Sequence, residues 1–229
     1  MRFSDSYEVP NDVLARGASP EYREFLRNWF ADPRAVIDHE LDLSFVRRIP
    51  ADELARAREL IRDNLKVGHT HIVEGAAVLG DVAAVPILRD MLNFESNPSR
   101  RLTIAGALWM LVQDPAFLSC LNESKSSVGR LFTGHHLYQI LWLDDERALD
   151  FLVDLSGHND HFVRYSVLSL LNQLESGEPF RLPERLEHGA EFYRRRQRDD
   201  GFRRTMVASI RRWNRAHADS TSFRFEGWE

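Results

Sequence analysis

The chain has 229 residues, of which 43% are hydrophobic and 28% charged, as in an ordinary globular protein. Its net charge of −5 argues against binding nucleic acid over its whole surface, and its lone cysteine, Cys120, excludes an internal disulfide framework. No stretch reaches the roughly 20 apolar residues of a membrane span, and the N-terminus has no apolar leader. We therefore expect a cytoplasmic protein without a membrane partner.

The first 50 residues are expected to form a helical cap. Residues 19–21 are a helix start, with a serine N-cap, a proline at the first helical position and a glutamate in the first turn. The apolar residues that follow share one helical face: Tyr22, Phe25, Leu26, Trp29 and Phe30. The pair at 32–33, Asp-Pro, ends this helix, and a short second helix is expected over 34–40.

Residues 51–175 are expected to form four helical hairpins, which start near Asp52, Asp81, Asp114 and Asp145, at spacings of 29, 33 and 31. The predicted helices span 52–66, 71–79, 82–92, 100–112, 114–121, 131–143, 146–155 and 162–174. Turns are predicted near Gly68, Asn97, Ser126 and Gly157. The register predicts these leucines to be buried between repeats: Leu88, Leu108, Leu141, Leu152 and Leu171. Self-similarity at this period is typical of a helical solenoid.

The stretch 75–88, Gly-Ala-Ala-Val-Leu-Gly-Asp-Val-Ala-Ala-Val-Pro-Ile-Leu, resembles the HEAT-like repeat named after phycobilisome lyases. The stretch 161–171, His-Phe-Val-Arg-Tyr-Ser-Val-Leu-Ser-Leu-Leu, resembles the second helix of that repeat. This resemblance implies an all-α fold, a short α-solenoid of about four HEAT-like hairpins. Helical caps over 1–50 and 176–229 would complete a single continuous domain. Such repeats serve scaffolds, inhibitors and a few enzymes, so the resemblance does not indicate one activity.

Second helices of such repeats line the concave surface. The Val-Arg pattern aligns Arg101 with Arg164. Trp109 and Trp142, 33 residues apart, then fall at the same outward position. The predicted partner-binding stripe consists of Trp109, His135, Tyr138, Trp142, Tyr165 and Asn172. Tryptophan and tyrosine bring large contact areas and are enriched at binding hot spots. The alternative, that these rings pack between neighbouring helices, is left open.

Several histidines fall in hairpin turns or at the starts of second helices: His69, His71, His135, His136, His158 and His161. A metal site needs three or four converging ligands. Deoxyhypusine hydroxylase, a di-iron enzyme on similar repeats, uses repeated His-Glu pairs, whereas the only such pair here, His39-Glu40, precedes the repeats. We therefore expect scattered surface histidines, no metal and no other cofactor.

The segment 190–217 holds nine arginines, with the densest run at 194–198. Either it is a strip for phosphate or for an acidic protein, or it is a solvated helix face neutralised by acids elsewhere. The overall negative charge favours the solvated face. A later helical face is defined by Phe202, Met206, Ile210 and Trp213.

Common catalytic signatures are missing: the chain has no Gly-rich phosphate loop, Gly-x-Ser-x-Gly, His-Glu-x-x-His or zinc-spaced cysteine set. An enzyme is thus not favoured, and we predict a protein-binding module similar to bacterial immunity or antitoxin proteins, with a toxin domain as partner. A basic partner would suit four acids, Glu74, Asp144, Asp145 and Glu146. The alternatives are an alkylpurine DNA glycosylase, which is built from similar repeats, another nucleic-acid-binding protein, and a bilin-lyase-like chaperone.

Overall fold

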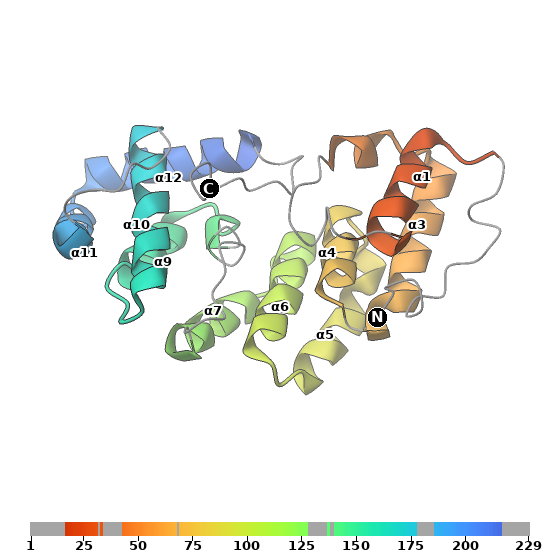
Figure 1. The fold of residues 1–229 in the computed structure, drawn as a ribbon, viewed down its shortest axis with the longest axis horizontal. Coiled ribbons are helices and arrows are strands. Elements are labelled where there is room, and N and C mark those ends of the chain that lie inside the picture. Colours follow the sequence, from red (N-terminus) through yellow and green to blue (C-terminus); the bar gives the residue numbers. More distant parts are fainter. Residues whose placement is uncertain are drawn as a thin grey trace. The chain divides into compact units, whose positions relative to one another are not determined.

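The computed structural model describes residues 17–31, 33, 43–67, 69–127, 137, 140–177 and 186–216. Every regular element in these ranges is a helix (Figure 1), so the all-α fold class is confirmed. The chain divides into two compact units, with the boundary between Asn122 and Glu123. The domain boundaries predicted near residues 50 and 175 stay a prediction.

The N-terminal unit begins with the helix that the sequence predicts, α1 (Pro20–Leu26), which continues as the π-helix η2 (Arg27–Ala31). Its further elements are η3 (Leu43–Arg48), α3 (Ala51–Asn64), η4 (Leu65–Val67), α4 (Thr70–Val78), η5 (Val82–Ala84), α5 (Val85–Phe94), α6 (Pro98–Val112) and α7 (Ala116–Ser127). The last residues of α7 belong to the second unit. Helix α6 packs against both α4 and α5, and α1 packs against α3.

The apolar face of α1 and η2 is fully buried, as predicted. Ser19 caps α1 by accepting a hydrogen bond from the Tyr22 amide at 3.0 Å. The Trp29 indole N–H donates to the carbonyl oxygen of His71 at 3.1 Å. A Cβ atom at Gly75 would lie 2.6 Å from Nε1 of Trp29, so only glycine allows the indole to approach α4 this closely.

The C-terminal unit contains the hairpin of α9 (Glu146–Leu155) and α10 (His161–Ser176). Two further helices, α11 (Leu186–Arg196) and α12 (Asp200–Ala216), each pack against both members of the hairpin. Phe202, Met206 and Ile210 are buried on the inner face of α12. This face was predicted from its helical spacing.

The α5–α6 and α9–α10 hairpins have the same local structure. Asn97 caps α6 and Asp160 caps α10, each through two backbone amides. Four residues after its cap, Arg101 donates to the carbonyl oxygens of Leu92 and Glu95. Arg164 donates in the same way to the carbonyl oxygens of His158 and Asn159. The alignment of the two arginines thus corresponds to a shared role, which is to hold the turn between the paired helices.

One predicted boundary is wrong. Helix α7 does not end near residue 121 but continues to Ser127, so the turn predicted near Ser126 is helical. Residues 122–127 contain neither glycine nor proline, and the buried Cys120 and Leu121 anchor the preceding turn, so nothing breaks the helix there. Gly68, the predicted helix 34–40 and most of the predicted helix 131–143 lie outside the described residues.

The turns predicted near Asn97 and Gly157 are confirmed. All five leucines that were predicted to be buried have no exposed surface: Leu88, Leu108, Leu141, Leu152 and Leu171. None of the helices in the described ranges combines the length and the apolar character needed to cross a membrane.

Candidate functional site

The predicted partner-binding stripe is only partly within the described residues. Trp109 lies on α6 of the N-terminal unit, whereas Trp142, Tyr165 and Asn172 lie in the C-terminal unit, and all four are half-buried. The Trp109 ring lies 5.9 Å from the buried ring of Phe117. Positions 135 and 138 of the stripe, His135 and Tyr138, lie outside the described residues. Whether the stripe binds a partner stays a prediction.

Helix α10 adds an aromatic residue that the sequence pattern did not single out. Phe162, three residues before Tyr165, is 49% exposed. Tyr165 and Asn172 are two helical turns apart, so all three side chains lie within about 80° of each other around the helix. The sequence does contain a signal for this exposure. Val163 and Val167 have the i, i+4 spacing of a buried helical face, and Phe162 does not belong to that series.

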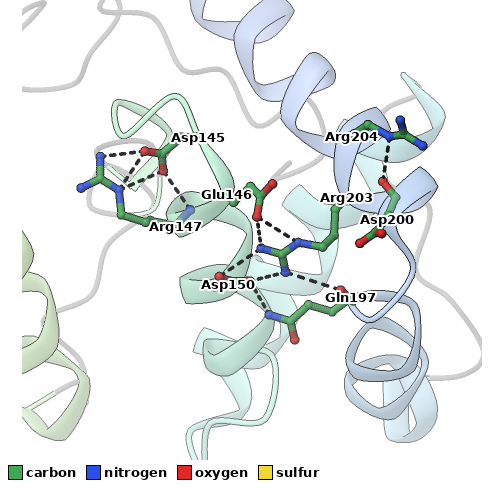
Figure 2. A network of polar contacts seen from close by, with 8 residues as sticks. All are labelled: Asp145, Glu146, Arg147, Asp150, Gln197, Asp200, Arg203 and Arg204. Atoms are coloured by element: carbon green, nitrogen blue, oxygen red, sulfur yellow. Dashed lines mark hydrogen bonds and ion pairs between the residues drawn. The ribbon is translucent and has the colours of Figure 1, made fainter.

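Figure 2 shows a polar network between α9 and the C-terminal helices. The Arg203 guanidinium donates to Glu146 Oε2 at 2.6 Å and to Asp150 Oδ1 at 2.7 Å, with only 18% of the arginine side chain exposed. Gln197 donates to the same Asp150 oxygen at 2.6 Å. Burial tends to raise the pKa of Asp150, but hydrogen bonds from Arg203 and Gln197 outweigh it and lower the pKa below its usual range.

A second cluster surrounds Arg196. Its guanidinium lies over the Phe202 ring, 4.2 Å from the centroid, and pairs with Glu175. Tyr193 donates its hydroxyl to Glu175 at 3.2 Å, and burial together with the Glu175 charge raises the pKa of this phenol above its usual range. The neighbouring Arg195 pairs with Glu191. These pairs agree with the interpretation that acids neutralise much of the 194–198 run.

Glycine again permits a close contact in this unit. A Cβ atom at Gly157 would lie 1.8 Å from an Nη atom of Arg194, so the guanidinium occupies the space above the glycine. Arg194 is therefore held against the turn that follows α9. A sequence pattern indicates the arginine run, but it does not indicate which acid or turn each arginine will meet.

A shallow pocket of about 550 Å³ opens beside these pairs. Its lining residues are Glu175, Arg195, Arg196, Asp199, Phe202, Thr205 and Met206. Two arginines oppose two carboxylates, so the lining carries no net charge. Asp199 also accepts a hydrogen bond from the Phe202 amide at 2.6 Å, which caps α12. Both arginines of the lining already have acidic partners, since Arg196 pairs with Glu175 and Arg195 pairs with Glu191.

The histidines behave differently from the prediction in one case. His71 is not at the surface but only 2% exposed, because it belongs to the face of α4 that packs beneath Trp29. Burial, assisted by the neighbouring His69, lowers the pKa of His71 to about 4, so its imidazole is neutral at pH 7. Across the described ranges, no three His, Cys, Asp or Glu side chains are placed to hold a metal ion.

Comparison with known proteins found no matching family model, no matching curated protein and no matching solved structure. The HEAT-like resemblance therefore stays a prediction.

Proposed function

We propose that the chain is a non-catalytic protein-binding module that holds its partner against aromatic side chains. The observation that carries this proposal is the partial exposure of Trp142, Tyr165 and Phe162 in the C-terminal unit. An aromatic ring that keeps part of its surface in water gains binding energy when a partner covers it.

The hairpins would form a short HEAT-like solenoid, and the second helix of each hairpin would line its concave surface. The partner would be a toxin domain that the protein neutralises in the cytoplasm, as immunity proteins do. The shared turn geometry of α5–α6 and α9–α10 supports the repeat arrangement. It also agrees with the alignment on which the stripe was predicted.

Charge gives this proposal little support. Three of the four acids expected to attract a basic partner already have arginine partners within the chain. The Asp144 carboxylate lies 3.9 Å from Arg211, whose Nε–H donates to the Asp144 backbone oxygen. Asp145 accepts from Arg147 and Glu146 from Arg203. The alkylpurine glycosylase alternative has no better support, because Arg101 and Arg164 at the second-helix starts donate to turn carbonyls and not toward a groove.

The test is to identify the partner by crosslinking and affinity purification, and then to measure its affinity for purified variants. Replacing Trp142 and Tyr165 together with alanine should weaken binding by about 30-fold or more, the equivalent of ~2 kcal/mol. The helical circular dichroism should not change. Phe94→Ala is the matched control, because Phe94 is 82% exposed in the other unit and should not affect binding. Unchanged affinity of the double variant would refute the proposed surface.

A further inference from the structure

Helix α12 has two contrasting faces. Its inner face is buried against α9 and α10 through Phe202, Met206 and Ile210. Its outer face is exposed and consists of Arg204, Thr205, Ala208, Arg211, Arg212 and Arg215, with Asp200 and Gly201 at its N-terminal end. Four of these eight residues carry a positive charge, so the outer face is basic although the chain as a whole is acidic.

Most of the outer arginines differ from their neighbour Arg203, which pairs with two carboxylates, in meeting no carboxylate among the described residues. Figure 2 shows the Arg203 side chain extending toward α9 and that of Arg204 extending away from it. Arg204 donates only to the backbone oxygen of Asp200, at 3.2 Å. Arg211 lies 3.9 Å from the Asp144 carboxylate, with both side chains about half exposed. Among the described residues, no carboxylate lies within ion-pair distance of Arg204, Arg212 or Arg215.

Helical geometry places these charges in one stripe. At about 100° per residue, Arg204, Arg211 and Arg215 fall within an arc of about 40°, and Arg212 lies about 80° from Arg204. The 11 residue steps from Arg204 to Arg215 rise ~16 Å along the axis. The phosphates of each strand of a nucleic-acid duplex follow one another every 3.4 Å along the duplex axis. The stripe is therefore long enough to span several consecutive phosphates.

The chemistry of the stripe decides among possible polyanions. A protein interface is anchored by buried aromatic or aliphatic side chains, and a membrane-surface helix inserts an apolar face. Between its arginines the outer face of α12 offers only Thr205 and Ala208, so it fits neither. It also lacks the aromatic platforms on which single-stranded bases stack. Phosphate contacts, in contrast, need only well-placed cations, and the arginine fork matches a phosphate bidentately.

We propose that the outer face of α12 binds the phosphate backbone of double-stranded nucleic acid without reading its sequence. This surface is separate from the proposed protein-binding residues on α10, and either can exist without the other. If each of the three arginines without a carboxylate partner contacts one phosphate, binding releases about three counterions from the duplex. A rise from about 50 to 200 mM salt should then weaken binding by about 40-fold.

The experiment measures fluorescence anisotropy of the full chain with a labelled DNA duplex of about 20 base pairs, several times the length of the stripe. The test variant combines Arg204→Gln, Arg212→Gln and Arg215→Gln. It should lose at least about tenfold in affinity at low salt and most of the salt dependence. A second duplex of unrelated sequence should bind the wild-type chain within about threefold, since phosphate contacts carry no sequence information.

The matched control combines Arg89→Gln, Arg147→Gln and Arg195→Gln. These arginines are also exposed, and their substitution removes the same total charge, but each is paired with a carboxylate. The control should keep the wild-type salt dependence. The proposal is overturned if the wild-type chain does not bind at low salt, or if test and control variants lose affinity equally. It is also overturned if poly-glutamate or anionic phospholipid vesicles bind as tightly as the duplex.

Discussion

In each unit two elements cover a neighbouring pair of helices, but they do so in different ways: α1 and η2 pack on α3 and α4, and α11 and α12 pack on α9 and α10. In the N-terminal unit, α1 and η2 bring a cluster of buried rings, in which Phe25 stacks on Trp29 at 5.1 Å and meets Phe30 edge-on at 5.9 Å. In the C-terminal unit, α11 and α12 add partly exposed ion pairs, such as Arg203 with Asp150, to their apolar contact. Burial of apolar surface does not depend on ionic screening, whereas exposed ion pairs are weak and screened by salt. The apolar cover, α1 and η2, is therefore held by apolar packing, whereas the charged cover, α11 and α12, is also oriented by ion pairs.

The largest expected effect tests the apolar cover. Replacing Trp29 with alanine should cost about 3–5 kcal/mol in the free energy of unfolding of the N-terminal unit, because the fully buried ring would leave a cavity. The loss should be the same at low salt and at about 1 M salt. Denaturant melts followed by circular dichroism provide the measurement. A cost below about 1 kcal/mol would show that the aromatic cluster does not hold this unit together.

A smaller effect is expected from pH, through His71 in the same unit. Its pKa is lowered to about 4 in the folded chain, against about 6.5 when unfolded. The unfolded chain therefore binds the proton first, and stability is complete above about pH 6.5 and falls as the pH drops toward 4. The loss should reach about 2–3 kcal/mol near pH 4.5, from the difference between the two pKa values.

Denaturant melts of the wild-type chain and of His71→Gln between about pH 7 and 4.5 test this effect. The variant should be less stable at neutral pH because the buried site is disturbed, but its stability should depend less on pH. Equal pH dependence of the two proteins would show that His71 is not buried in its neutral form.

The smallest effect concerns the charged cover. Arg203→Gln should destabilise the docking of α12 by about 1 kcal/mol at low salt, and by less at about 1 M salt. The folded pKa of Asp150 is lowered, so this contribution is present above the ordinary carboxylate pKa of about 4 and is lost as the pH falls below it. Amide hydrogen exchange in α12 measures the effect. Arg204→Gln is the matched control, and an equal change in both variants would remove the distinction between inner and outer arginines.

Local signals in the sequence were sufficient for most helices. The cap and proline before α1, Asp145 before α9 and the apolar spacing of α10 each predict an element that the structure contains. The 3-10 helix η3 was not predicted, because six residues are too few for a helical period to emerge. The polar end of α7 was misread as a loop since composition alone does not terminate a helix.

The candidate surfaces were less predictable than the helices. Spacing indicates which side chains share a helical face, but it does not indicate which distant group lies opposite. Arg203 meets acids 53 and 57 residues earlier in the chain, and His71 is buried by a tryptophan 42 residues earlier. Such pairings depend on tertiary packing, and a single sequence carries no direct signal for them.

The contact between Trp29 and Gly75 also has a consequence for folding order. Helix α4 has nine residues and includes the glycine and four β-branched residues, Thr70, Ile72, Val73 and Val78, so it is too short and too poor in helix formers to persist alone. Its helical structure therefore depends on tertiary packing, against α6 and α3 and against the indole that hydrogen-bonds to it. The segment around Trp29 thus stabilises a helix that lies more than 40 residues later in the chain, and the two should form in one cooperative step.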